Sequence, residues 1–157
     1  MRDGTRVGVD VGKVRIGVSR SDPRGTLAMP VETVKRASDA TDIARIAAIV
    51  DEYEATEVIV GLPLSLSGAS TASTQDAEHF AQQLADRLAV PVRMVDERLS
   101  TVSAQSAMRA SGRTTKNSRV VIDQAAASVI LQHALDVERA SAKPPGTLVH
   151  PTIGTTS

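Results

Sequence analysis

The sequence lacks cysteine and tryptophan altogether and contains a single tyrosine and a single phenylalanine in 157 residues. Without cysteine, the chain can form neither disulfide bonds nor a thiolate metal site. Proteins that hold single-stranded nucleic acid by stacking its bases need aromatic platforms, which this composition mostly lacks. A nucleic-acid ligand would therefore be held through its backbone rather than through base stacking.

The sequence also lacks a long apolar run and an excess of charge of either sign. Its first residues, MRDGTRVGVDVG, are too polar for a signal peptide or a membrane anchor, so a cytoplasmic protein without a membrane partner is expected. Basic and acidic residues number 18 each, so a surface for a polyanion has to come from local clustering. With 41% hydrophobic and 23% charged residues, the chain fits one globular domain.

Hydrophobic periodicity predicts an α/β fold. Period-two alternation and turn residues indicate a three-strand antiparallel meander, and two short apolar runs indicate parallel strands. The expected strands are 5–10, 15–19, 26–34, 57–61 and 91–95, and the expected helices are 39–54, 75–89, 100–110 and 119–139. We therefore expect a five-stranded mixed sheet flanked by helices in one domain, 1–139. The remaining residues, 140–157, are rich in Pro, Gly, Ser and Thr and are expected to form a disordered tail.

Asp10 stands near the end of the first expected strand, on the face opposite Val7 and Val9. Its neighbours on the same face are Gly8 and Gly12, which would leave room for a metal ion or a phosphate. The alternative is a polar residue that starts a turn, where aspartate is common.

Asp96 and Glu97 follow the fifth expected strand directly. Strand alternation lets only one of them point to a given face. The alternatives to a functional role are solvation, a favourable interaction with the N-terminus of the next helix, and an ion pair with Arg98.

Asp123 lies inside an apolar helix, with Ala126 and Ile130 on its face. A buried carboxylate needs a partner, because an unpaired charge in an apolar environment is costly. That partner is either a basic residue, such as Arg98 or Arg15, or a cation.

Together, Asp10, Glu97 and Asp123 would offer only carboxylate oxygens, which favour hard ions such as Mg²⁺ or Mn²⁺. Two such ions about 3.5–4 Å apart activate a water and stabilise the leaving oxygen in phosphodiester hydrolysis. The sequence alone leaves open whether the three acids meet in space.

Four segments resemble, in order, the motifs of the YqgF or RuvX family of candidate pre-16S rRNA nucleases and Holliday-junction-resolvase-like proteins. They are GVDVG (8–12), VGLPLSLSG (60–68), DERLSTVSA (96–104) and IDQAAA with ILQ (122–127 and 130–132). The resemblance covers about residues 5–138 and implies an RNase H-like fold. It also implies that Asp10, Glu97 and Asp123 are the catalytic, metal-binding acids. The chain departs from the family at Ser65 and Ser67, where the family usually has Asn and Asp.

Several basic residues lie where a substrate backbone could pass. The candidate substrate-binding residues are Lys13, Arg15, Arg98, Arg113 and Lys116. Each of them alone could equally be a solvated surface residue, but clustered phosphate contacts would give affinity without sequence specificity.

The carboxylates predict a metal-dependent nuclease, and the family resemblance implies that it processes the 5′ end of pre-16S rRNA. The protein is expected to act as a monomer or a homodimer. The alternatives are a Holliday junction resolvase, for which a dimer with two sites would be favoured, and a non-catalytic nucleic-acid-binding assembly factor. An ATPase of the actin and sugar-kinase type is disfavoured, because the chain is too short for its second lobe and has no later Asp-x-Gly phosphate motif.

Overall fold

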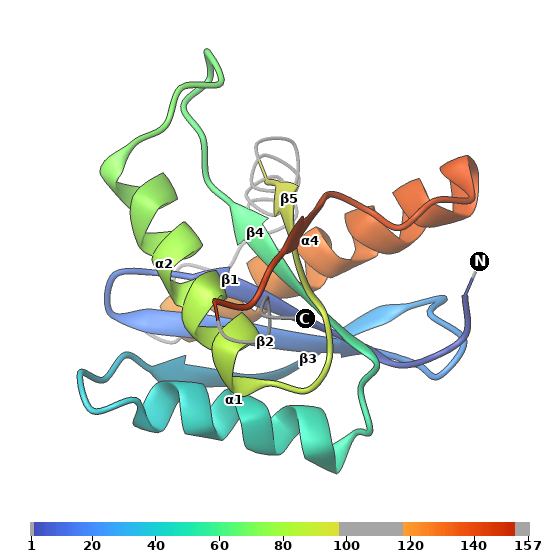
Figure 1. The fold of residues 1–157 in the computed structure, drawn as a ribbon, viewed down its shortest axis with the longest axis horizontal. Helices are drawn as coiled ribbons and strands as arrows, with labels where there is room; N and C mark the ends of the chain where they lie inside the picture. Colours follow the sequence, from blue (N-terminus) through green and yellow to red (C-terminus); the bar gives the residue numbers. More distant parts are fainter. Residues whose placement is uncertain (1, 98–117, 153–157) are drawn as a thin grey trace.

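The computed structural model describes residues 2–97 and 118–152. The described chain forms three layers, in which α1 and α2 cover one face of a sheet and α4 covers the other (Figure 1). The elements are β1 (Arg6–Val11), β2 (Arg15–Ser21), β3 (Ala28–Lys35), α1 (Thr41–Glu52), β4 (Glu57–Leu62), α2 (Ala72–Arg87), β5 (Val92–Asp96), α4 (Ser118–Ser141) and β6 (Thr147–Val149). The expected helix at 100–110 lies outside the described residues.

The sheet has the strand order β3-β2-β1-β4-β5-β6. Strands β1, β2 and β3 form the expected antiparallel meander, and β4 and β5 pair in parallel, β4 with β1 and β5 with β4. The mixed sheet predicted from the sequence is therefore confirmed, with six strands in the described residues rather than five.

The two faces of the sheet differ in the size of their side chains. On β1, Val7 and Val9 are fully buried in the larger core, under α1 and α2. Gly8 and Asp10 alternate with them and face α4. A smaller apolar cluster joins α4 to β4 and β5; it consists of Ile59, Val95, Ile130, Leu131, Ala134 and Leu135. This cluster fixes the middle of α4 over β4 and β5, and Asp123 lies nearer the beginning of the helix.

Helix α2 begins earlier than its periodicity indicates. Thr71 precedes the helix, and its side chain accepts a hydrogen bond from the backbone N–H of Thr74, while the Thr74 hydroxyl accepts one from the N–H of Thr71. This reciprocal cap starts the helix at Ala72, three residues before the expected position. No helix in the described parts of the chain is long and apolar enough to cross a membrane.

The segment expected to be a disordered tail contains a sixth strand. Strand β6 pairs antiparallel with β5, with Leu148 opposite Arg93. The turn before it needs Gly146, which has φ +64°, and a Cβ there would overlap the Met94 carbonyl oxygen. The expectation was wrong for β6, because a strand of three residues is too short to show periodicity. Residues 153–157 lie outside the described residues.

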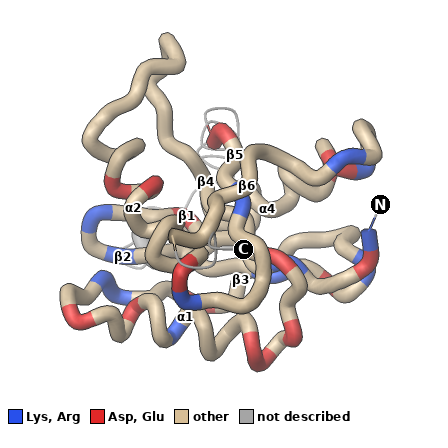
Figure 2. Tube along the Cα trace, viewed as in Figure 1, with Lys and Arg blue, Asp and Glu red and all other residues tan. Residues whose placement is uncertain are grey.

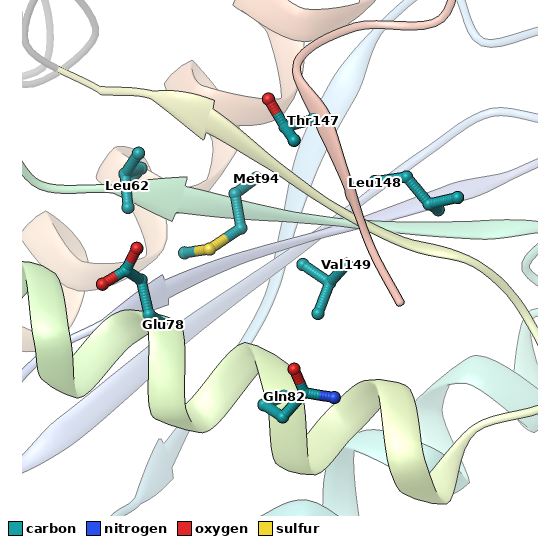
Figure 3. Close-up of a pocket in the computed structure, with 7 residues that line it drawn as sticks. All are labelled: Leu62, Glu78, Gln82, Met94, Thr147, Leu148 and Val149. Atoms are coloured by element: carbon teal, nitrogen blue, oxygen red, sulfur yellow. The ribbon is translucent and has the colours of Figure 1, made fainter. Parts of the chain in front are cut away.

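Strand β6 and helix α2 enclose a pocket of about 360 Å³ at the edge of β5 (Figure 3). Val149 packs against the larger core, and the His150 carbonyl accepts a hydrogen bond from the Gln82 side chain at 2.8 Å. Arg93 donates to the Pro145 carbonyl at 3.3 Å. These contacts attach the C-terminal segment to the sheet.

Truncation after Ala142 is expected to lower the free energy of unfolding by about 2–4 kcal/mol, because it removes a ladder of hydrogen bonds and uncovers part of the core. Urea unfolding measures the loss, and Lys143→Gln, which changes only an exposed side chain, is the control. An unchanged midpoint in the truncated chain would show that β6 does not contribute to stability.

Candidate active site

Asp10 lies in β1 directly opposite Gly17 of β2 and faces α4. It is partly buried, because the helix covers this face of the sheet. Strand alternation therefore places Asp10 where the sequence predicted, on the side away from the valine core.

Glu97 follows β5 and lies over β4. Its backbone N–H donates a hydrogen bond to the Leu62 carbonyl at 3.2 Å, which extends the pairing of the two strands by one residue. Its carboxylate occupies the space beside Gly61, where an added Cβ would overlap Glu97 Oε2. Asp96 is exposed, so Glu97 is the acid of this pair that faces the inside.

Asp123 is in the second turn of α4, and its carboxylate forms an ion pair with Arg15. Arg15 Nε lies 2.9 Å from Asp123 Oδ2, with the two side chains 33% and 22% exposed. Of the two kinds of partner predicted from the sequence, the structure shows the basic residue. The ion pair links α4 to the beginning of β2.

Glycines in the middle of strands bring α4 close to the sheet. A Cβ on Gly17 would overlap the backbone carbonyl of Asp123, and one on Gly8 would lie 2.8 Å from Leu131 Cβ. Ser19 donates a hydrogen bond to the Ala127 carbonyl at 2.8 Å. The interpretation of Gly8 as space for a metal or phosphate was therefore wrong, because the helix fills that space. Sequence reasoning missed Gly17 and Gly61, although a glycine inside a strand is a signal of close approach.

Burial and neighbouring carboxylates hold the two sheet acids at raised pKa. Burial, followed by repulsion from Asp123, raises the pKa of Asp10 to about 6. Burial, followed by repulsion from Asp10 and Asp96, raises the pKa of Glu97 to about 7. Asp10 is thus near enough to both Asp123 and Glu97 for their charges to interact.

Other buried acids of the described chain behave differently. Glu57 and Glu138, at the beginning of β4 and near the end of α4, both bind Arg2, at 3.0 and 2.9 Å. Burial would raise the pKa of Glu138, but the hydrogen bonds from Arg2 outweigh it and the pKa is lowered. Arginine neutralises these two acids, which have a structural role. Asp10 and Glu97, in contrast, are buried beside other carboxylates that repel them.

The raised pKa values predict how the stability of the metal-free protein changes with pH. Protonated Asp10 and Glu97 favour the folded state, so their contribution is complete below about pH 4 and is lost as the pH rises through about 6 to 7. The difference in unfolding free energy between Asp10→Asn and the wild type should therefore grow from pH 4 to pH 8. Urea unfolding in EDTA across this range tests it, and a constant difference would contradict it.

The three acids fit a hard divalent cation, because all donors are carboxylate oxygens. In addition, no cationic partner lowers the pKa of Asp10 or Glu97, which is raised in both. In residues 2–97 and 118–152, however, no three acidic, histidine or cysteine side chains are already placed to hold one ion. The Asp123 carboxylate is engaged by Arg15. A metal centre of the three acids remains a prediction, and at Asp123 the cation would compete with Arg15, which binds Oδ2.

Of the basic residues predicted to bind substrate, the structure describes Lys13 and Arg15. Lys13 is exposed in the β1–β2 hairpin, beside Arg15, and Figure 2 shows the blue segments that Lys and Arg form along this hairpin. Arg98, Arg113 and Lys116 lie outside the described residues. Arg36 was missed by the sequence reasoning: it donates to the Gly12 carbonyl at 2.8 Å and to Asp76 of α2, and so supports the hairpin from the other face.

The two serines that depart from the family pattern lie in the loop between β4 and α2. Ser65 Oγ and Ser67 Oγ are 2.9 Å apart, and Ser65 Oγ also accepts a hydrogen bond from the backbone N–H of Ala69. Their hydroxyls stabilise the turn of this loop, which projects away from the sheet (Figure 1).

The sequence matches the family described as RuvX, Holliday junction resolvase, over residues 4–137. A protein of Leifsonia xyli subsp. xyli, named as a candidate pre-16S rRNA nuclease, is 62% identical over 98% of this chain and 99% of its own length. One of the same name from Thermobifida fusca is 55% identical over 97% and 99%. Among solved structures, Thermus thermophilus RuvC in complex with a Holliday junction substrate has a TM-score of 0.54 at 19% identity, over 90% of this chain and 99% of that one. The shared fold confirms the expected RNase H-like architecture.

Proposed function

This chain belongs to the RuvX family of nucleases, and from that premise we propose that it processes the 5′ end of pre-16S rRNA by metal-dependent phosphodiester hydrolysis. Asp10, Glu97 and Asp123 are the catalytic acids and the metal ligands of this proposal. The observation that carries it is that Asp10 and Glu97 lie on the face of the sheet covered by α4, the helix that contains Asp123, and that burial and neighbouring carboxylates raise the pKa of both.

Two ions of Mg²⁺ or Mn²⁺, when bound, would supply an activated water and stabilise the leaving oxygen. The residues of the chain provide the remainder of the site. Gly61 leaves the space in which the Glu97 carboxylate lies, and Gly17 lets Asp123 approach the sheet. The low-dielectric surroundings of Asp10 strengthen its interaction with a cation.

The substrate is proposed from the relatives, which are named for pre-16S rRNA. The scarcity of aromatic side chains favours contacts with the sugar–phosphate backbone. Lys13 and Arg15 provide such contacts beside Asp10, and Arg98, Arg113 and Lys116 are proposed for the same role. We expect the protein to work in the cytoplasm, as a monomer or a homodimer.

The test is cleavage of a labelled pre-16S rRNA 5′ leader fragment beside a synthetic four-way DNA junction, in Mg²⁺ or Mn²⁺, by the wild type and Asp10→Asn. Cleavage of the RNA alone, lost in the variant, is the expected result. If both substrates are bound but neither is cut with either metal, the protein is a non-catalytic binding factor and the proposal fails.

A Holliday junction resolvase is the second candidate, favoured by the description of the family and by the fold shared with RuvC. Symmetric cutting of a junction would favour a dimer with two sites. Cleavage of the junction in preference to the RNA, by a species that sediments as a dimer, would establish this alternative.

A further inference from the structure

A hollow of about 370 Å³ lies beside the candidate active site, between the β1–β2 hairpin and β3. It is lined by Val14, Arg15, Thr33 and Lys35. Arg15 and Lys35 are directly opposite each other in the antiparallel pair β2–β3, so their side chains emerge on the same face of the sheet.

The two basic residues of this hollow differ in their partners. Lys35 is exposed, and within the described parts of the chain it forms no ion pair. Arg15 is half-buried and is bound through Nε to Asp123. One wall of the hollow is tied to α4 beside Asp123, because Gln124 Nε2 donates to the Thr33 hydroxyl at 3.2 Å. The hollow therefore carries two basic side chains and adjoins Asp123 through Arg15.

We propose that this hollow is a phosphate subsite for the nucleic-acid substrate, in which Lys35 and Arg15 bind one backbone phosphate and Arg15 thereby releases Asp123 to the metal. The inference rests on the proposed function, since it assigns the three acids to a metal centre. It adds a binding residue, Lys35, and makes Arg15 a positioning residue for Asp123.

The physical basis is a competition for two charged groups. A dication at Asp123 repels the Arg15 guanidinium, and a phosphate in the hollow attracts it. Binding of either ligand therefore breaks the Arg15–Asp123 ion pair, which opposes binding of the other. By linkage, the substrate phosphate and the metal raise each other's affinity. Without nucleic acid, the Arg15–Asp123 pair competes with the metal for Asp123.

The subsite is tested with Lys35→Gln and its matched control Lys143→Gln, an exposed lysine beyond the far end of α4. Binding of a fluorescent pre-16S rRNA leader fragment in EDTA is measured across a salt series. Lys35→Gln should weaken binding and reduce the slope of log K against log salt by about 0.7–0.9, the contribution of one phosphate contact. Lys143→Gln should leave the slope unchanged. Equal slopes for all three proteins would overturn the subsite.

The exchange at Asp123 is tested by Mn²⁺ binding in the absence of nucleic acid, measured by calorimetry for the wild type, Arg15→Gln and Asp10→Asn. Arg15→Gln should bind Mn²⁺ about two- to fivefold more tightly than the wild type, because the competing ion pair is gone. Unchanged or weaker binding in Arg15→Gln, with binding lost in Asp10→Asn, would overturn the exchange and leave the metal centre standing. Wild-type binding that Asp10→Asn does not weaken would instead contradict the metal centre of the proposed function.

Discussion

Asp10→Asn is expected to abolish cleavage while making the metal-free protein more stable. The substitution removes a ligand of the proposed metal centre, which is expected to cost roughly a thousandfold in single-turnover rate. It also removes a carboxylate whose pKa is raised to about 6 by burial and by Asp123. At pH 8 the wild type keeps this acid ionised at a cost, so the variant should gain on the order of 1–3 kcal/mol in unfolding free energy.

Both effects can be measured on the same preparation, by cleavage of the RNA leader in Mn²⁺ and by urea unfolding in EDTA. Asp51→Asn is the charge-matched control, because Asp51 is exposed on α1, in the opposite layer. The control should change neither quantity appreciably. A variant Asp10→Asn that is inactive and also less stable than the wild type would indicate a structural role for Asp10.

The second large effect is the loss of stability or of metal binding when one of two glycines that face α4 is replaced by alanine. A Cβ on Gly17 would overlap a backbone carbonyl, that of Asp123, so Gly17→Ala has to displace the helix and should cost more than about 2 kcal/mol of stability. A Cβ on Gly61 would meet two side-chain ends instead, Glu97 Oε2 and Ile130 Cδ1. Gly61→Ala should therefore cost less stability, and should weaken Mn²⁺ binding by moving Glu97.

Each glycine variant is the control for the other, because both add one methyl group to the same face of the sheet. Urea unfolding and Mn²⁺ titration of the two proteins give the comparison. If Gly61→Ala proved the less stable of the two, or if it bound Mn²⁺ as tightly as the wild type, the packing of Glu97 against Gly61 would not be what positions this acid.

Local sequence patterns predicted the faces on which two of the acids lie. Strand alternation in β1 placed Asp10 on the face away from the valines, and the same rule at β5 separated Asp96 from Glu97. Both predictions depend on period two alone, which is a property of the backbone. The meander and the parallel strands followed from the same patterns and from turn residues.

What could not be predicted depends on contacts between elements distant in sequence. Arg15 and Asp123 are 108 residues apart, and the sequence offered Arg98 as an equal partner. The close approach of α4 to Gly17 and Gly61 is decided by backbone and side-chain positions on other elements. Strand β6 forms by pairing three residues, after a glycine turn, with the edge of β5. A strand this short has no periodicity from which it could be predicted.

The central claim is that Asp10, Glu97 and Asp123 act together as one metal-dependent nuclease centre. The most direct measurement is the single-turnover rate of RNA leader cleavage at saturating Mn²⁺ for Asp10→Asn, Glu97→Gln and Asp123→Asn, each shown to be folded and to bind the RNA. Each variant is predicted to lose about a thousandfold or more in rate. Wild-type cleavage by any one of the three would contradict the claim that this acid belongs to the centre.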